Sequence, residues 1–376
     1  MRALVVTTII DTIEAFLLPH IDILLDSGYD VDIATNINVP TPDNIMNKCD
    51  NIYNIEFNRS PLSTDNVKAY KKIKNILNTK NYDIVYVHTP IASAITRLAC
   101  KNIKNIKDIN IIYFAHGFHF FEGAPIKNWI IFYPIEKYLS KFTDILITIN
   151  KEDYERANKR FKAKKTVLLN GVGIDLKKIQ EVIVGKEEKR KELGLKKEDI
   201  VLLSVGELNS NKNHIEVLKA INMIDNKENI KYLICGRGDK KQFLNNYIHE
   251  NGLDNNVELL GFRNDIIEIC KISDIFIFPS KREGLPVSVM EAMACGLPVI
   301  CSNIRGNIDL IDDYGGKVVK KNNMNYYYEG IINLIKNPLA RNRQGAYNLD
   351  KIKKFDKDEV LQELKLVIND IKRGNS

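Results

Sequence analysis

The residues best suited to chemistry lie in one segment, PSKREGLPVSVMEAMACGLPVICS, at residues 279–302. This segment starts at the end of an apolar run that has the length of a strand. Pro286 is expected in the first turn of the next helix, where a proline is best tolerated. The backbone amides of Val287 and Ser288 would then be free at a helix N-terminus, which suits an anion such as a diphosphate. Glu291, three and four residues further on, would share their face of the helix.

Two carboxylates, those of Glu283 and Glu291, accompany this anion site. They would repel a phosphate unless they bind hydroxyl groups, for which ionised carboxylates are strong acceptors. The spacing therefore favours a nucleotide sugar over a bare nucleotide. For an isolated pair of glutamates, a helix cap and a solvated helix residue would be the simpler interpretation, but the framework of Gly284, Pro286 and Gly296 favours a ligand.

The elements that must position these residues alternate along almost the whole chain. Short apolar runs are separated by stretches of helical period, which predicts parallel βαβ units with right-handed crossovers. Strands are expected at residues 4–6, 29–35, 83–88, 109–117, 144–150 and 166–171, and again at 200–207, 231–236, 257–261, 274–280 and 297–302.

The apolar signal fades into a charged stretch between Gly171 and Glu198, where we expect a domain boundary. The fold class is then α/β, with two tandem Rossmann-like, doubly wound parallel-sheet domains at residues 1–175 and 176–355. An amphipathic helix at 356–376 is expected to cross back to the first domain. Ligands of such sheets bind beyond the carboxyl ends of the strands, and a cleft between domains is the default site.

Composition excludes several classes of protein. The 376 residues carry 55 Lys and Arg against 48 Asp and Glu, a net charge of +7, with 44% hydrophobic residues. This is an ordinary globular composition, neither disordered, fibrous nor disulfide-stapled. The six cysteines show no metal-binding spacing and are expected to be reduced. Without a recognisable leader or an apolar run of about 18 residues, a cytoplasmic location is expected.

The excess of basic residues has more than one interpretation. Lysine-rich helices are expected around residues 68–80 and 159–165. Solvated helix faces are the first interpretation, and an anionic bilayer or a phosphate-bearing substrate is the alternative. Nucleic acid is not expected as a partner, because no basic stretch is interleaved with aromatic residues in the manner of a stacking platform and no known nucleic-acid-binding motif is present.

Five segments in order carry a resemblance to a known family. EGLPVSVMEAMACGLPV resembles the signature of the retaining glycosyltransferases of family 4, which have the two-Rossmann GT-B fold, and within them the bacterial capsule and exopolysaccharide enzymes. The segments AHGFHFFEGAP, TDILITINKEDYERA, LNGVGID and SVGELNSNKNH, at residues 115–125, 143–157, 169–175 and 204–214, are also similar to that family. The resemblance covers nearly the whole chain.

The resemblance implies roles residue by residue. Glu291 would bind the ribose hydroxyls of the nucleotide, and Glu283, as a catalytic group, the hydroxyls of the donor sugar. Lys212 would neutralise the departing diphosphate, and His116, directly after a strand, would contact the donor near the reacting centre. The other donor-binding residues implied are Gly117, Gly206, Asn213, Arg237, Arg263, Gly284, Leu285, Pro286 and Val287. No cofactor or metal is expected, because no Asp-x-Asp motif stands at a strand end.

The chain departs from the family at Glu207, where many members carry an arginine. One phosphate charge is thus unassigned, and Arg237 and Arg282 are both candidates to supply it. Arg263 stands where the backbone reads the nucleotide base, although its side chain could equally be a surface residue. His88, at another strand end, is a second candidate for the site, whereas His119 is left to packing.

The segment at residues 124–142 mixes aromatic residues with lysines. Such a composition can lie in a membrane interface, with aromatics at the headgroup level. Core packing is the interpretation we favour, because Pro134 is expected to interrupt the helix and the aromatic residues suffice to cover a sheet. A contact with an anionic membrane therefore rests mainly on the resemblance, which implies a polyprenyl-diphosphate-linked acceptor.

The leading hypothesis is a retaining transferase that moves a sugar from a UDP-linked donor to a lipid-linked saccharide, at the inner face of the cell membrane. A nucleotide-sugar epimerase of the same fold and a non-catalytic carbohydrate-binding protein are the alternatives. A glycoside hydrolase fits poorly. If residues 283–291 were all helical, their two carboxylates would be about 12 Å apart, too far to flank one bond.

Overall fold

The chain is described by a computed structural model at residues 1–58, 60, 63–104, 106–320 and 322–374. It divides into two compact units. Unit 1 comprises Met1–Gly173 together with Asp358–Ser376, and unit 2 comprises Ile174–Lys357. The sequence-based division placed the corresponding boundaries after residues 175 and 355.

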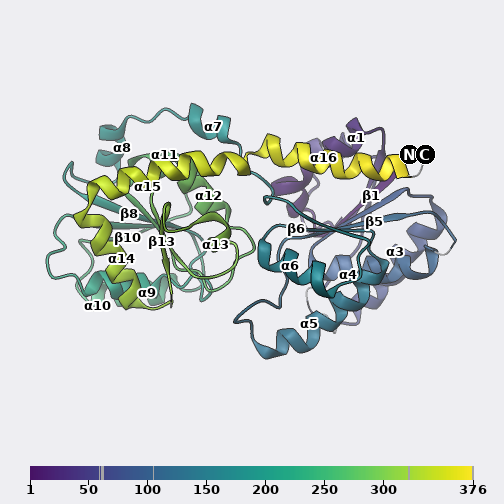
Figure 1. Cartoon of the computed structure of the whole chain (residues 1–376), viewed down its shortest axis with the longest axis horizontal. Helices are drawn as coiled ribbons and strands as arrows, with labels where there is room; N and C mark the ends of the chain where they lie inside the picture. Colours follow the sequence, from purple (N-terminus) through teal and green to yellow (C-terminus); the bar gives the residue numbers. More distant parts are fainter. Residues whose placement is uncertain (59, 61–62, 105, 321, 375–376) are drawn as a thin grey trace. The chain divides into compact units, whose positions relative to one another are not determined.

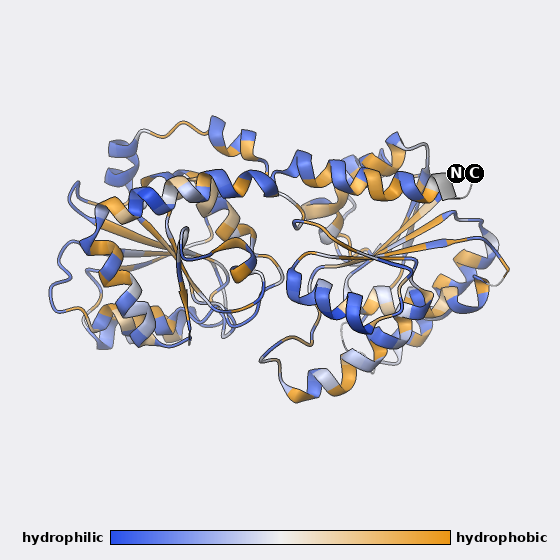
Figure 2. Ribbon diagram, in the orientation of Figure 1, coloured by the Kyte–Doolittle hydropathy of each residue, from blue (hydrophilic) through white to orange (hydrophobic). Residues whose placement is uncertain are grey.

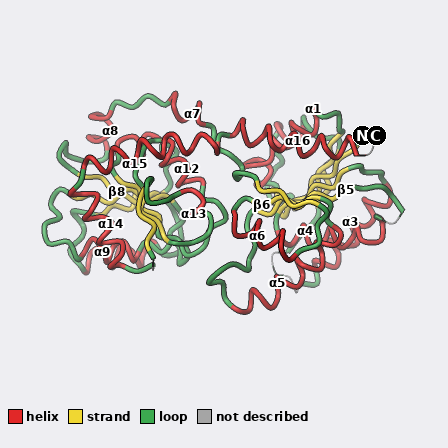
Figure 3. The backbone as a smooth tube through the Cα atoms, viewed as in Figure 1, coloured by secondary structure: helices red, strands yellow, loops and turns green. Residues whose placement is uncertain are grey.

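Unit 1 is built on a seven-stranded sheet in which every neighbouring pair is parallel, in the order β3-β2-β1-β4-β5-β6-β7. Its central strands are buried on both faces and rich in Val and Ile, as expected for a parallel sheet covered by helices (Figure 3). The strands are β1 (Arg2–Ile9), β2 (Asp30–Asn36), β3 (Asn51–Asn54), β4 (Ile84–His88), β5 (Asn110–Ala115), β6 (Ile145–Thr148) and β7 (Lys165–Leu168).

Helices connect these strands and cover the sheet (Figure 1). They are η1 (Ile13–Leu17), α1 (Leu18–Asp26), α2 (Asp43–Met46), α3 (Asp65–Thr79), α4 (Pro90–Ile103), α5 (Ile126–Leu139), η2 (Ser140–Phe142) and α6 (Lys151–Arg160). The last helix of the chain, α16 (Lys357–Gly374), belongs to unit 1 from Asp358 onward. Its apolar face, including Leu364 and Ile368, is fully buried, which confirms the amphipathic pattern.

Unit 2 repeats the architecture with six parallel strands in the order β10-β9-β8-β11-β12-β13. The strands are β8 (Ile200–Val205), β9 (Ile230–Cys235), β10 (Val257–Gly261), β11 (Ile275–Phe278), β12 (Val299–Ser302) and β13 (Gly316–Val319). The helices are α7 (Leu176–Glu181), α8 (Lys186–Glu192), α9 (Ile215–Asn222), α10 (Lys241–Glu250), α11 (Ile266–Ile272), α12 (Val287–Ala294), α13 (Asn307–Leu310), α14 (Met324–Lys336), α15 (Pro338–Lys351) and η3 (Ile352–Phe355).

Both sheets contain a point where the order of connection reverses. It lies between β1 and β4 in unit 1, and between β8 and β11 in unit 2. Loops leave such a point in opposite directions and open a crevice beyond the carboxyl ends of the strands, which is where ligands of doubly wound sheets bind. The two-domain α/β fold predicted from the sequence is confirmed, and the residues to inspect are those that follow these four strands.

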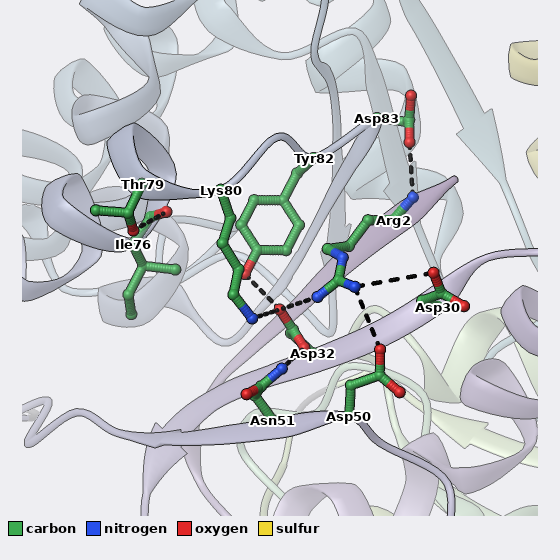
Figure 4. Close-up of polar contacts among 10 residues, drawn as sticks. All are labelled: Arg2, Asp30, Asp32, Asp50, Asn51, Ile76, Thr79, Lys80, Tyr82 and Asp83. Atoms are coloured by element: carbon green, nitrogen blue, oxygen red, sulfur yellow. Dashed lines mark hydrogen bonds and ion pairs between the residues drawn. The ribbon is translucent and has the colours of Figure 1, made fainter.

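The opposite, amino edge of the sheet in unit 1 is held by a buried carboxylate (Figure 4). Asp32, fully buried at the start of β2, accepts hydrogen bonds from Tyr82 (2.6 Å), Asn51 (2.7 Å) and Lys80 (3.1 Å), and pairs with Arg2 at 3.4 Å. Burial by itself would raise the pKa of Asp32, but these hydrogen bonds hold it below its usual value. The cluster lies away from the carboxyl edge, so its role is structural.

Candidate active site

Lys212 and Glu283 meet at the reversal point of unit 2. Lys212 lies in the loop after β8 and Glu283 in the loop after β11, and Nζ of Lys212 is 2.7 Å from Oε1 of Glu283. The ammonium also lies 4.6 Å from the centre of the Phe278 ring. The two side chains are only 18% and 15% exposed. A partly buried cation is therefore held at the strand edge where ligands of this fold bind.

Asparagine side chains fix the two loops to each other. Oδ1 of Asn209 accepts hydrogen bonds from the backbone amides of Asn211 (2.9 Å) and Lys212 (3.0 Å). Asn211 in turn donates its side-chain amide to the carbonyl of Arg282 (3.0 Å), and its carbonyl accepts from the amide of Lys281 (2.8 Å). Lys212 is thereby positioned by backbone hydrogen bonds and not only by its partner Glu283.

Two glycines leave room for this arrangement. A Cβ atom on Gly206, at the end of β8, would lie 3.1 Å from Cε of Lys212. A Cβ atom on Gly236, at the end of β9, would lie 1.9 Å from the carbonyl oxygen of Gly206, which no side chain can do. The close approach of the backbone after these two strands therefore requires glycine at residue 236.

The signature segment forms the start of α12. The helix begins at Val287, so Pro286 is its N-cap residue and not, as the sequence predicted, part of its first turn. Pro286 offers no side-chain acceptor, and no side-chain cap occupies the first amides of α12, those of Val287 and Ser288. Leu285 and Pro286 are buried. The carbonyl of Glu283 accepts from Nε of Arg305 at 3.1 Å, which holds the loop before the helix.

Glu291, in the second turn of α12, is a half-buried carboxylate. Burial raises its pKa to about 7. Within the described part of the chain its side chain forms no hydrogen bond or ion pair. A half-buried carboxylate without a protein partner has unused hydrogen-bonding capacity, which hydroxyl groups of a ligand can fill.

A pocket of about 660 Å³ lies at the carboxyl ends of β8, β9 and β10. Its lining includes Gly206, Glu207, Arg237, Phe262 and Arg263. The Arg237 guanidinium lies 5.2 Å from the Phe262 ring centre, and Phe262 is 61% exposed. An aromatic face, a cation and a partly apolar wall are suited to a heteroaromatic base and its phosphates.

The three arginines considered from the sequence differ in their surroundings. Arg263 is engaged by Asp265 (2.8 Å) and Glu192 (2.9 Å), so its guanidinium already has two carboxylate partners. Arg282 is exposed. Arg237 lies in the pocket with Glu207, whose carboxylate accepts a hydrogen bond from the side chain of Asn209 at 2.7 Å. Of the three, Arg237 lies in the pocket and has no carboxylate partner among the described residues, so it can meet an anion there.

Asn213 and Gly284 support the same loops. Asn213 is buried with φ of 56°, a left-handed conformation that asparagine tolerates, and it donates to Oδ1 of Asn322 at 3.2 Å. The carbonyl of Gly284 lies so close to Gly306 that a Cβ there would be 2.4 Å from it. Both residues shape the backbone around Lys212 and α12.

In unit 1, His116 and His88 follow adjacent strands at the carboxyl edge. His88 ends β4 and is fully buried, and His116 directly follows β5 and is half-buried. Nδ1 of His88 lies 3.3 Å from Nε2 of His116. Gly117, with φ of 132°, starts the turn that leads away from His116. Burial lowers the pKa of His116 to about 4, so both its ring and that of His88, whose pKa burial also lowers, are neutral at pH 7.

The ring of His119 stacks on Phe132 of α5, with centroids 4.6 Å apart, so it packs as the sequence suggested. Sequence reasoning missed Asn209, Phe262 and Phe278. The first organises the Lys212 loop, and the other two lie beside cations. The run of asparagines after a strand was the available signal, since short amide side chains commonly close turns on their own backbone. Nothing local marks Phe262, whose role depends on a neighbouring strand.

Comparisons with known proteins identify the family and the fold. The family described as Glycosyl transferases group 1 matches residues 185–351, and that described as Glycosyl transferase 4-like matches residues 6–150. A putative glycosyltransferase, EpsD of Bacillus subtilis, is 30% identical over 93% of this chain and 92% of its own. The chain therefore belongs to the group 1 glycosyltransferases.

Three further comparisons concern one relative and two solved structures. A UDP-Gal:alpha-D-GlcNAc-diphosphoundecaprenol alpha-1,3-galactosyltransferase of Escherichia coli is 32% identical over 71% of this chain and 70% of its own. The crystal structure of Anabaena HepE with UDP and glucose superposes with a TM-score of 0.78 at 18% identity, covering 98% of this chain and 100% of that one. Sucrose-phosphate synthase from Thermosynechococcus elongatus gives 0.79 at 16% identity, over the full length of both chains. These likenesses confirm the GT-B fold.

Proposed function

We propose that this glycosyltransferase moves a sugar, with retention of configuration, from a UDP-sugar to a saccharide carried on a polyprenyl diphosphate. The observation that carries the proposal is the Lys212–Glu283 pair at the reversal point of unit 2, beside the uncapped start of α12. A cation and free amides bind a diphosphate, and an adjacent carboxylate binds hydroxyls. The three together match a donor that carries both groups.

The chemistry of the relatives supports the same donor and acceptor. The Escherichia coli relative is named for a UDP-linked galactose donor and a diphosphoundecaprenol acceptor, and a Campylobacter jejuni relative, 29% identical over 76% of this chain, transfers N-acetylgalactosamine to a diphospho-undecaprenol saccharide. For this chain the sugar is unassigned, and the lipid diphosphate is the part of the acceptor that both relatives share.

The residues of unit 2 would divide the work as follows. The pocket beside Phe262 binds the nucleotide, and Glu291 accepts hydrogen bonds from the ribose hydroxyls. The amides of Val287 and Ser288 bind the diphosphate. In transfer, the acceptor hydroxyl oxygen bonds to the anomeric carbon as the bond from that carbon to the phosphate breaks. The hydroxyl proton passes to the departing phosphate, whose charge Lys212 stabilises without a metal ion. Donation to the phosphate requires Lys212 to leave Glu283, which then accepts from sugar hydroxyls.

The test is a transfer assay on the full chain with a panel of UDP-sugars and a short-chain polyprenyl-diphosphate saccharide, in the presence of EDTA. We expect one donor to give a glycosylated lipid with the α configuration by NMR. The Lys212→Ala variant serves as the inactive control. Formation of an isomerised UDP-sugar without acceptor would assign an epimerase, and donor binding without either product would leave a binding protein.

A membrane contact belongs to the same proposal, through one face of α5. Four isoleucines of this helix are exposed, Ile126 at 74% and Ile130 at 68%, with Ile131 and Ile135 less so. Figure 2 shows hydrophobic stretches along α5. Pro134 lies inside α5 without ending it, contrary to the expectation that it would interrupt the helix. The aromatic residues Trp129, Phe132 and Tyr133 pack against the core as expected.

The charge on α5 suits an anionic bilayer. Its one acidic residue, Glu136, is buried in an ion pair with Arg97 of α4, at 2.7 Å, so it offers no charge to the surface. Lys127 and Lys137 are exposed on the helix, and Lys141 follows it. Apolar side chains between lysines are the pattern of an interfacial helix. No helix in the described part of the chain is both long enough and apolar enough to span a bilayer.

Co-sedimentation with vesicles tests this contact. We expect binding to vesicles that contain phosphatidylglycerol and little binding to pure phosphatidylcholine. Replacing Ile126 and Ile130 by Gln should weaken binding about a hundredfold or more, since each buried isoleucine contributes roughly 1.5–3 kcal/mol and about 1.4 kcal/mol is a factor of ten. Leu366→Gln, at a 67% exposed position of α16, is the matched control and should bind as the wild type does. Equal binding by the α5 variant would remove the proposed membrane face.

A further inference from the structure

The carboxyl edge of unit 1 holds a pair of histidines in which one ring is buried behind the other. His88 is fully buried, and its ring packs against Tyr86 at 4.3 Å and Phe114 at 5.6 Å between centroids. Within the described residues, the one hydrogen bond of the ring joins Nδ1 to Nε2 of His116, at 3.3 Å. Its other nitrogen, Nε2, is buried without a partner there. His88 therefore does not reach a ligand itself.

The backbone of His88 is also fixed. Thr89, with the left-handed φ of 61°, donates its hydroxyl to the carbonyl of His88 at 2.6 Å. The same hydroxyl accepts from the amide of Thr8, at the carboxyl end of β1, at 3.1 Å. Strained backbone in a non-glycine residue persists only where its surroundings enforce it. The position of the His88 ring is thus fixed by its backbone and by the neighbouring rings of Tyr86 and Phe114.

The proton positions follow from what the two rings can satisfy. A neutral imidazole carries one N–H and one acceptor nitrogen, so one histidine of the pair donates and the other accepts. If His116 donated from Nε2, the proton of His88 would sit on its own Nε2, buried with no acceptor. If His88 donates from Nδ1, only a lone pair is buried there. A buried N–H group without an acceptor is rarer and costs more free energy than a buried nitrogen lone pair without a donor, so the second arrangement is favoured.

We infer that His88 is a positioning residue that holds His116 as the tautomer protonated at Nδ1. His88 donates from Nδ1 to Nε2 of His116, and His116 then presents its Nδ1–H as a donor. Nδ1 of His116 forms no hydrogen bond within the described residues, and the ring is half-buried at the strand edge. The substrate group it suits is an acceptor oxygen, of a diphosphate or a sugar hydroxyl. This last assignment rests on the proposed function, whereas the tautomer does not.

The tautomer can be measured directly on the full wild-type chain. Two-bond nitrogen–proton correlations on protein labelled with ¹⁵N-histidine distinguish a protonated Nδ1 from a protonated Nε2, and the signals of His116 are identified by their loss in His116→Ala. We expect a protonated Nδ1 and an unprotonated Nε2 at pH 7.5. A proton on Nε2 of His116 would overturn the inference, whatever the activity of the protein.

Two substitutions at residue 88 separate the hydrogen bond from the filling of space. In His88→Asn the side-chain amide nitrogen stands where Nδ1 stood, so the Nδ1–H tautomer of His116 should persist. In His88→Gln the amide lies one bond further out, and in His88→Leu there is no donor, so His116 should shift to a mixture of tautomers. Retention of the wild-type tautomer in both Gln and Leu variants would overturn the role of His88.

Kinetics then test whether the tautomer is used. His88→Leu should lower kcat/KM about tenfold, the effect of losing one hydrogen bond to a polar substrate group, while His88→Asn should stay near the wild type. In a His116→Ala background the same substitution should have no further effect, because His88 acts through His116. Additive losses would assign His88 a structural role. If the wild type transfers no sugar at all but shows the expected tautomer, the proposed function fails and the positioning role stands.

Discussion

Donor binding should depend on pH through Glu291. Burial raises the pKa of this carboxyl to about 7, and only the ionised form accepts hydrogen bonds from two ribose hydroxyls. The ionised fraction is about one tenth at pH 6 and about nine tenths at pH 8. Because the apparent Kd is the intrinsic Kd divided by the competent fraction, the UDP-sugar should bind roughly tenfold more weakly at pH 6 than at pH 8.

Isothermal titration calorimetry with a UDP-sugar measures this dependence. A UDP-sugar is preferable to UDP, because each of its phosphates is esterified on two sides and gains no proton in this range. Titrations at pH 7 in two buffers of different ionisation enthalpy should also show the release of about half a proton on binding. Buried His214, whose pKa desolvation lowers to about 4, stays neutral throughout and adds no slope.

The matched control is Glu291→Gln, which keeps the size of the side chain and cannot ionise. Its affinity should be low and equal at pH 6 and pH 8. A wild-type Kd that is the same at both pH values would refute the assignment of Glu291 to the ribose. A slope that survives in the Gln variant would refute it as well, because the titrating group would then lie elsewhere.

Three further outcomes follow from the same contacts. Because its folded pKa lies above the unfolded value of about 4.5, ionised Glu291 destabilises the fold, so Glu291→Gln should raise Tm relative to wild type at pH 8 and not at pH 4, by differential scanning fluorimetry. Lys212→Ala should lower kcat by about 100-fold with a smaller change in donor KM, in the transfer assay. Asp32→Asn should lower the free energy of unfolding, measured in urea, by about 3 kcal/mol at pH 7 and by less below pH 4. The pKa of Asp32 is lowered in the fold, so its ionised carboxylate stabilises the protein only above the unfolded pKa.

Each of these outcomes has a clear contrary result. An Asp32→Asn variant as stable as the wild type would mean that Arg2 and Lys80 are satisfied by solvent. A Lys212→Ala variant whose only change is a higher KM would assign the lysine to ground-state binding. A Tm difference for Glu291→Gln that is the same at pH 8 and pH 4 would mean that it does not come from ionisation.

The order of elements was readable from the sequence because parallel strands buried on both faces are continuous apolar runs. All eleven expected strands are present, but β3 (Asn51–Asn54) and β13 (Gly316–Val319) were missed. Both lie at the edge of their sheet and have four residues, mixed with polar ones. An edge strand pairs on one side only and is less covered by helices than a central strand. It therefore does not need the continuous apolar run by which a central strand is recognised in the sequence.

The site divides in the same way between local and non-local information. The uncapped start of α12 depends on residues close in sequence, and the sequence predicted both an anion site there and a carboxylate on the same face of the helix. The Lys212–Glu283 contact joins residues 71 apart, and the His88–His116 contact residues 28 apart. Only the strand order brings such residues together, so sequence could place each at a strand end without saying which atoms meet.

The sequence left open which residue supplies the positive charge that the family resemblance implies at residue 207, and the structure reduces the candidates. A carboxylate where the family resemblance implies an arginine would add negative charge beside a diphosphate, which is unfavourable unless another cation offsets it. Asn209 donates a hydrogen bond to the Glu207 carboxylate, Arg263 is held by two carboxylates, and Arg237 remains in the pocket against Phe262. The charge missing at residue 207 is thus available from the end of the next strand of the sheet, β9, since both strand ends line one pocket. On this argument Arg237→Gln should weaken UDP-sugar binding, whereas Arg282→Gln, at an exposed position outside that pocket lining, should not.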